Sequence, residues 1–470
     1  MHVGTERSIS AGRRTRREFL QHGAAIALAG KYLASNAGSP VLAADGPTAT
    51  QERPATPATP DHLPHKLAIC SWQWAWLTHS GPGEAYSDLE EVMQGLKERN
   101  YNAVRLDTAL HWCFQRDGSP RGEVAIRQTI PGYSERFRVV NHKGGVSVDA
   151  LQRLCDVMKL ARQHDVFMIL SDWEYMHTTW FVADAELRQE VTGIAEEERL
   201  MVLARHMARL VDLLKDQDLA GQIAYIEPHN EADYSDFPQG DEGQALHTEA
   251  VAYLRERHPD ILVSANFGSS GKVGTTENSQ LYDRHAYVGG AVYGDLWNKT
   301  VFREDFDLEN LRQDPLLAKF LEEHIAPYGE FERGMPSAGD DKWRARFWSY
   351  HNTNVDTFDR WLTERYAEMQ DQLKDHARVV YAKHAEEAAR LGLPMVVTEG
   401  GFFYSPLYSR FEESEAGLDY FDYLTDLAIE HNLWGFLPST YNGPEIPLWW
   451  ACPKWLKQNN ARFLRGEKKG

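Results

Sequence analysis

Cysteine is scarce in this chain, with four residues among 470: Cys70, Cys113, Cys155 and Cys452. No two of them are close enough in sequence to form a metal-binding or redox motif. If the first and last strands of the fold are neighbours, Cys70 and Cys452 approach each other. We nevertheless favour isolated buried thiols, which is how free cysteines usually occur in soluble proteins.

Positive charge is also in short supply. The net charge is −19, and residues 1–44 carry a basic excess, so the rest of the chain is even more acidic. An acidic body excludes nucleic acid and anionic membranes as probable partners. It weakly disfavours polyanionic substrates. The 14 Trp and 20 Tyr residues suit a protein that grips the flat faces of sugar rings, although aromatic residues also fill cores.

Long hydrophobic runs are missing as well. The longest near the N-terminus covers residues 23–30, and a membrane-spanning helix needs about 20 apolar residues. It follows Arg16-Arg17 and Phe19-Leu20, which resemble a twin-arginine export motif, and precedes small residues at 41–44 that fit a cleavage site. We therefore expect residues 1–44 to be an export signal, a bacterial periplasmic or secreted location, and no membrane anchor after removal of the signal.

The remainder divides into a linker and one domain. Residues 45–65 are rich in Pro, Ala and Thr, which is typical of an unstructured linker. From residue 66 apolar strand-like runs alternate with amphipathic helices, which predicts an α/β fold, a parallel (β/α)8 TIM barrel over residues 66–470. The expected strands cover 66–71, 102–107, 166–171, 222–226, 261–266, 284–288, 394–399 and 433–439; the expected helices cover 87–99, 147–164, 194–215, 242–257, 355–391 and 415–430.

Two segments exceed a minimal barrel. A possible hairpin turns at Pro131-Gly132. A long insertion at 289–354, between the sixth and seventh strands, carries several Trp and Tyr residues. Loops of this length are usually functional or ordered by packing. The insertion either forms one wall of a substrate cleft or packs as a peripheral helical addition, and the sequence leaves both readings open.

Two of the predicted strands end in a carboxylate. Gln222 to Ile226 leads into Asn230-Glu231, and Pro394 to Thr398 leads into Glu399. In a barrel of parallel strands the chemistry lies at the C-terminal strand ends. Glycosidic-bond hydrolysis needs one carboxyl as acid and another as base or nucleophile. Our hypothesis is that Glu231 is the general acid/base and Glu399 the nucleophile.

Other strand ends supply groups that support such a pair. Arg105 can pair with Glu399, Asn230 can bind a sugar hydroxyl, and Tyr287, near His285, can orient the nucleophile. Further candidates for substrate binding surround these strand ends: Trp173, His111, Trp434 and Tyr441, with Asp172, Glu174, Glu227 and His229 either binding sugar or supporting other residues.

These motifs resemble family 5 of the glycoside hydrolases, the cellulase-type retaining enzymes of the barrel clan. The resemblance runs in motif order from about residue 66 to 450. It rests on Asn102-Ala103-Val104-Arg105, on Asn230-Glu231, on His285-Ala286-Tyr287 and on Thr398-Glu399-Gly400. Where the family usually has a His at the end of the third strand, this chain reads Ser171-Asp172-Trp173-Glu174.

The resemblance implies a retaining hydrolase that acts on an oligo- or polysaccharide, a β-linked glucan or mannan-like glycan, without cofactor or metal. Two other readings share the barrel. One is a metal-dependent sugar isomerase or epimerase that gathers acidic and His residues such as Asp172, Glu227, His229 and Glu399 around a cation. The other is a barrel that binds glycans without cleaving them. The sequence does not predict the oligomeric state.

Overall fold

The computed structural model describes residues 59–128, 141–175, 178–232, 235–266, 278–289, 312–313, 315–322, 350–402 and 408–469. The predicted export signal, most of the predicted linker and most of the 289–354 insertion lie outside these residues, as does the turn at Pro131-Gly132. Within the described ranges, no helix combines the length and apolar character that crossing a membrane requires.

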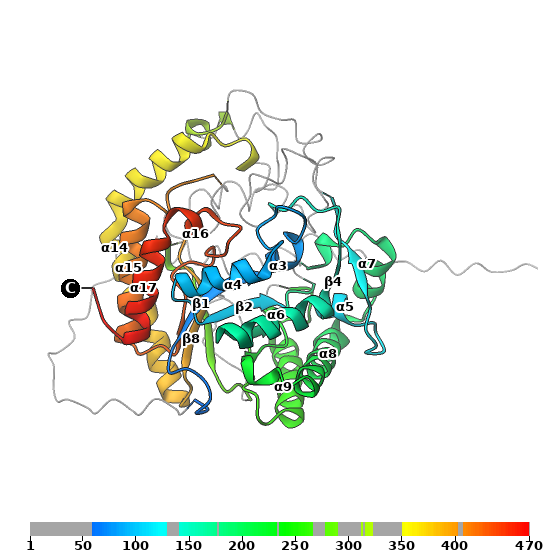
Figure 1. Cartoon of the computed structure of the whole chain (residues 1–470). Coiled ribbons are helices and arrows are strands. Elements are labelled where there is room, and N and C mark those ends of the chain that lie inside the picture. Colours follow the sequence, from blue (N-terminus) through cyan, green and yellow to red (C-terminus); the bar gives the residue numbers. More distant parts are fainter. Residues whose placement is uncertain are drawn as a thin grey trace, which may run out of the picture. The chain divides into compact units, whose positions relative to one another are not determined.

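A curled sheet of seven parallel strands forms the centre of the fold (Figure 1). Its spatial order is β6-β5-β2-β1-β9-β8-β7, so the first and last strands of the chain are neighbours. The strands are β1 (Leu67–Gln73), β2 (Ala103–Asp107), β5 (Phe167–Ser171), β6 (Ile223–Ile226), β7 (Tyr282–Ala286), β8 (Met395–Gly400) and β9 (Gly435–Phe436).

The gap between β6 and β7 is closed by a short extended segment. Val263 forms a parallel bridge with Ile226 on one side, and its carbonyl accepts a hydrogen bond from the Gln280 N–H on the other. The (β/α)8 barrel is thereby confirmed, but the strand expected at 261–266 is reduced to a single bridge. Its apolar run, residues 261–263, is only three residues long and gives way to Ser264, so the segment offers little that favours a longer strand.

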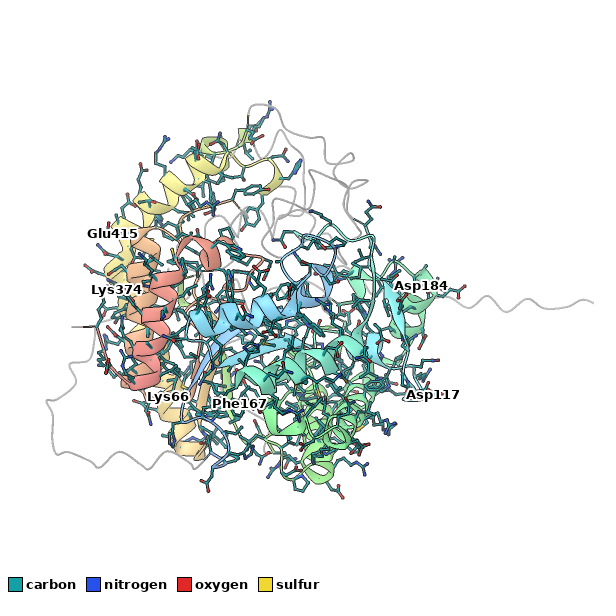
Figure 2. The ribbon with its side chains drawn as sticks, in the orientation of Figure 1. Lys66, Asp117, Phe167, Asp184, Lys374 and Glu415 are labelled. Carbon is teal, nitrogen blue, oxygen red and sulfur yellow. The ribbon has the colours of Figure 1, made fainter. Side chains whose placement is uncertain are left out.

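Helices pack outside the strands at the places where helical periodicity predicted them: α4 (Leu89–Glu98), α6 (Ala150–His164), α8 (Glu196–Asp216), α9 (Gly240–Arg257), α14 (Val355–Leu391) and α15 (Glu415–Glu430). Side-chain caps begin several of them, such as Asp88 for α4 and Ser414 for α15. The chain also forms α3 (Ala75–Thr78), α5 (Leu110–Cys113), α7 (Ala185–Thr192), α16 (Pro447–Ala451) and α17 (Pro453–Arg465). Lys374 of α14 pairs with Asp419 of α15 at 2.7 Å, on a surface lined with charged side chains (Figure 2).

Two small features complete the described chain. β3 (Glu123–Ala125) and β4 (Ser147–Asp149) pair antiparallel, flanking the segment in which the hairpin turn was predicted. All four cysteines are free thiols; Cys70, Cys113 and Cys155 are buried and Cys452 is partly so. The prediction of isolated thiols is confirmed.

The barrel interior has an apolar end and a polar end. Near the N-terminal strand ends, Leu67, Ala103, Phe167 and Tyr225 pack together with Trp434. The Trp434 ring lies 6.1 Å from that of Tyr225, and its indole N–H donates to the Pro64 carbonyl at 2.9 Å. Trp434 precedes β9 and therefore closes the barrel bottom, so the prediction that it binds substrate is wrong.

Candidate active site

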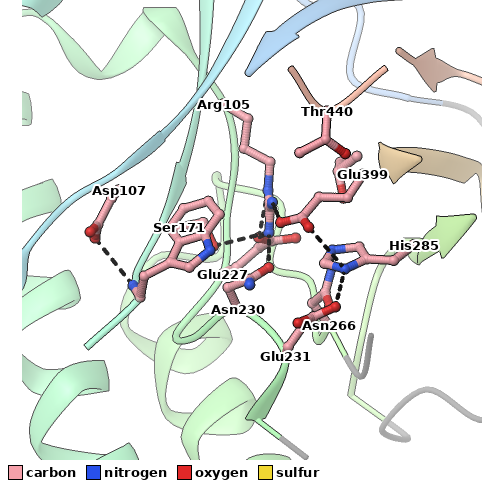
Figure 3. Close-up of polar contacts among 12 residues, drawn as sticks. Arg105, Asp107, Ser171, Glu227, Asn230, Glu231, Asn266, His285, Glu399 and Thr440 are labelled. Carbon is pink, nitrogen blue, oxygen red and sulfur yellow. Dashed lines mark hydrogen bonds and ion pairs between the residues drawn. The ribbon is translucent and has the colours of Figure 1, made fainter. Parts of the chain in front are cut away.

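Arg105 organises the polar end of the barrel. Its side chain is fully buried and extends from β2 among groups from three other strands (Figure 3). The guanidinium donates to Glu399 at 2.9 Å, to Glu227 at 2.8 Å and to Asn230 at 2.6 Å. Its carbon lies 4.4 Å above the Trp173 ring. A buried cation with several anionic and amide partners fixes the position of each of them.

Glu399 reaches Arg105 because β8 carries a bulge. The pairing with β7 jumps from Arg284–Val397 to His285–Glu399, which leaves Thr398 unpaired. A bulge re-aims the side chains that follow it: both Thr398 and Glu399 now make contacts inside the barrel. The second oxygen of Glu399 accepts the Tyr287 hydroxyl at 2.5 Å. The carboxylate is therefore held at both oxygens, by Arg105 and by Tyr287.

Glu231 lies in a strained and enclosed position. Its φ angle is +46°, in the left-handed region that non-glycine residues adopt at a cost of about 1 kcal/mol or more, often at functional sites. Burial raises the pKa of Glu231 to about 7, although Arg105 lowers it in part. A carboxyl with such a pKa keeps its proton near neutrality and can deliver it to a leaving group.

His285 links the two carboxyls. Its Nδ1 lies 2.5 Å from Glu231 and 3.4 Å from Glu399. Its Nε2 faces the Asn266 amide nitrogen at 2.9 Å, which makes Nε2 the acceptor and Nδ1 the donor. Burial lowers the pKa of His285 to about 4, so the ring is neutral at ordinary pH. A neutral ring with its proton on Nδ1 orients Glu231 without adding charge.

The separation of Glu231 and Glu399 is short. One oxygen of each carboxyl and the His285 nitrogen all lie within 4.8 Å of one another. Retaining glycosidases place their two carboxyls about 5–5.5 Å apart, whereas inverting ones leave about 6.5–9.5 Å for a water molecule. Carboxyl oxygens within 4.8 Å of one another are compatible with the shorter of these two spacings.

Four further residues named from the sequence occupy different surroundings. Asn230 and Trp173 lie against Arg105 as described. Tyr441 is buried in the main core, directly after Thr440, whose hydroxyl contacts the Tyr287 oxygen at 3.2 Å. His111 is buried on α5, with Nε2 at 3.0 Å from the Tyr175 hydroxyl and its ring beside His206. The structure thus gives His111 a packing position instead of the substrate-binding one expected.

The other acidic and His residues near the strand ends mostly support loops. Asp172 accepts the backbone N–H groups of Leu110 and Glu174, and the His229 Nε2 contacts the Glu174 carbonyl. Glu227, by contrast, joins the Arg105 cluster. Sequence reasoning missed Asp283, which is buried on β7 two residues before His285. The period-two alternation of a strand places both on the same face and was the available signal.

The chain is similar to a known protein family and to solved structures. A family described as sugar-binding cellulase-like matches residues 69–464. A Parabacteroides distasonis protein described as a glycoside hydrolase shares 16% identity, with a TM-score of 0.61, over 87% of this chain and 96% of that one. A family 5 mannosidase from Rhizomucor miehei shares 10% identity, with a TM-score of 0.43, over 86% and 94%. Curated proteins gave no match.

The family match extends from β1 almost to the end of α17 and so includes every strand of the barrel. The Parabacteroides distasonis structure shares the fold, and the strand ends carry an enclosed carboxyl pair. The chain belongs to the sugar-binding cellulase-like family and is a glycoside hydrolase.

Proposed function

We propose that this protein is a retaining β-glycoside hydrolase in which Glu231 is the acid/base and Glu399 the nucleophile. The observation that carries the proposal is the unequal environment of two carboxyls held within reach of one another. Glu399 is oriented by Arg105 and Tyr287, whereas burial raises the pKa of Glu231 to about 7. A carboxyl with a raised pKa, next to a second carboxyl held by a cation, is suited to the acid role while its neighbour acts as nucleophile.

The reaction follows from these positions. Glu231 protonates the leaving oxygen while a Glu399 oxygen attacks the anomeric carbon, which gives a covalent glycosyl-enzyme. Glu231, now ionised, then takes a proton from the water that releases the sugar. Arg105 and the Tyr287 hydroxyl hold Glu399 in place during attack, and Asn230 is close enough to the cluster to bind a hydroxyl of the same sugar.

The substrate class we propose is a neutral β-linked oligo- or polysaccharide of the glucan or mannan type. Support comes from the resemblance to family 5 enzymes and from the charge of the site, where the two carboxylates that contact Arg105, Glu227 and Glu399, outnumber that one cation. An acidic interior disfavours an anionic sugar. The twin-arginine-like leader supports the further proposal that the enzyme acts in the periplasm or outside a bacterial cell.

The test is cleavage of a panel of β-linked glucans and mannans, followed by NMR of the products as they form. We expect at least one glycan to be cleaved and the first product to keep the β-anomeric configuration. An α-anomer as the first product would contradict the mechanism. Failure to cleave any glycan in the panel, with binding retained, would favour a barrel that only binds sugar.

Contacts within the site disfavour the alternative of a metal-dependent sugar isomerase or epimerase. Glu231, His285 and Glu399 offer three ligand atoms within 4.8 Å. However, Arg105 donates to Glu399 at 2.9 Å, and the His285 Nδ1 that a cation needs carries the proton donated to Glu231. A nearby guanidinium also repels a divalent ion.

Activity is therefore expected to be unchanged, within about twofold, after dialysis against a chelator, because proton transfer and covalent attack need no cation. The measurement is the cleavage rate before and after chelation, paired with elemental analysis of the purified protein. One tightly held metal ion per chain, together with loss of activity that the metal restores, would establish the alternative.

A further inference from the structure

A second carboxyl pair lies beneath Arg105, deeper in the barrel than the first. Glu227, just past the end of β6, is fully buried and Asp283 on β7 nearly so. One oxygen of Glu227 accepts two hydrogen bonds from Arg105, at 2.8 and 3.2 Å. Among the described residues, no N–H or O–H group donates a hydrogen bond to its other oxygen. The Glu227 carboxyl also has the Asp283 carboxyl and the Ser171 hydroxyl as hydrogen-bond neighbours.

Two carboxyl groups can hydrogen-bond each other only if one of them carries a proton. Arg105 decides which one. Arg105 donates two hydrogen bonds to Glu227. Burial is the largest influence and raises the pKa of Glu227, but the guanidinium charge and the hydrogen bonds to this carboxyl together hold that pKa below its usual value. Burial and the negative Glu227 raise the pKa of Asp283 well above its usual value. The proton therefore resides on Asp283, which donates it to Glu227.

Asp283 is itself held in place. The Tyr225 hydroxyl contacts one of its oxygens at 3.0 Å, and the Thr398 hydroxyl contacts the other at 2.6 Å. Thr398 is the residue left unpaired by the bulge in β8, and Glu399 follows it directly. Asp283 thus contacts Glu227, the anion that holds Arg105, and Thr398, which lies in the bulge that positions Glu399.

We propose that Asp283 is a positioning residue which, as a neutral acid, donates a hydrogen bond to Glu227 and thereby fixes Arg105 against Glu399. The inference deepens the proposed function and rests on it for its catalytic consequence. With Asp283 neutral, Arg105 lies between two anions, Glu227 and Glu399. An ionised Asp283 would add a third anion below the guanidinium and draw it away from the Glu399 carboxylate.

Exchange of each carboxyl for its amide separates the members of the pair. Asp283→Asn keeps a neutral donor facing Glu227, so we expect kcat to stay within about threefold of the natural enzyme. Glu227→Gln removes the anion that holds Arg105, and a misplacement near 1 Å costs about 100-fold, so we expect kcat to fall by about that factor with KM little changed. Asp283→Ala, which removes the donor, should resemble Glu227→Gln.

A matched control is Glu445→Gln. Glu445 is a partly buried carboxyl that accepts a hydrogen bond from the Tyr86 hydroxyl at 2.7 Å, and its loss should leave kcat unchanged. Circular dichroism and thermal melting check that each variant is folded. A mild effect of Glu227→Gln with a severe effect of Asp283→Asn would place the proton on Glu227 and overturn the proposal. Equal effects of the two amide variants, whether mild or severe, would overturn it too.

Infrared difference spectra give a readout that needs no substrate. Asp283→Asn should remove one C=O band of a protonated buried carboxylic acid at neutral pH, whereas Glu227→Gln should remove a carboxylate band. Loss of the protonated band in Glu227→Gln instead would contradict the assignment. If no glycan is cleaved, the proposed function fails, and the infrared result still decides where the proton lies.

Discussion

Replacement of Glu399 by alanine is expected to lower kcat by about 10⁴-fold or more, because loss of the residue that forms the covalent intermediate removes the whole reaction path. Arg105 and Tyr287 would then face an empty space that the carboxylate had filled. Steady-state kinetics on the best glycan of the panel would measure the loss. The same assay with Glu445→Gln serves as a control, since that partly buried carboxyl is bonded to Tyr86 and lies in the segment between β9 and α16.

Azide provides the second half of this test. The vacated space beside Arg105 can admit a small anion, which attacks the anomeric carbon from the side that Glu399 occupied. We expect azide to restore part of the activity and to yield a glycosyl azide of the α configuration, identified by NMR. Activity of Glu399→Ala equal to that of the natural enzyme would remove Glu399 from the mechanism. Rescue that yields the β-azide would mean that a covalent intermediate still forms without Glu399, and would make Glu399 the acid/base instead of the nucleophile.

The positions of the main site residues could be predicted because they depend on local patterns. Arg105, Asn230, Glu231 and Glu399 each follow an apolar run that forms a strand, and parallel strands bring their C-terminal ends to one edge. The helices were equally predictable, since their apolar faces repeat with the helical period. For these elements the sequence within a single segment contains the necessary information.

Other features depend on contacts between distant segments. Trp434 lies close to strand residues in sequence, yet which end of the barrel it faces depends on where β9 begins, and β9 is only two residues long. The bulge at Thr398 arises from pairing with β7, a partner more than a hundred residues away. In the sequence, nothing distinguishes Asp283 from other acidic residues in strands. Its role becomes visible only once Glu227, Tyr225 and Thr398 are known to surround it. No pattern within one segment reports such contacts.

Glu231→Gln is expected to lower kcat on a natural glycan by about 10³-fold, because general acid catalysis contributes about 10²- to 10⁴-fold. An aryl glycoside with a strongly acidic leaving group needs no protonation, so its glycosylation rate should be nearly unchanged. In the natural enzyme, Glu231 must carry its proton to act. Since burial raises its pKa to about 7, activity on natural glycans should fall as pH rises through about 7. The measurement is the pH profile with both substrates.

The same shift in pKa predicts an effect on stability with a definite sign. A carboxyl whose folded pKa lies above its unfolded value of 4.5 favours folding when protonated, and this contribution is lost as pH rises through about 7. The difference amounts to at most about 3 kcal/mol at alkaline pH. Glu231→Gln cannot ionise and should therefore melt at a higher temperature than the natural protein at pH 9, and at a similar one at pH 4. If Glu231 is an enclosed general acid, Glu231→Gln should be slower on natural glycans and more stable at high pH. Equal melting temperatures of this variant and the natural protein at pH 9 would show that Glu231 is not a buried carboxyl with a raised pKa.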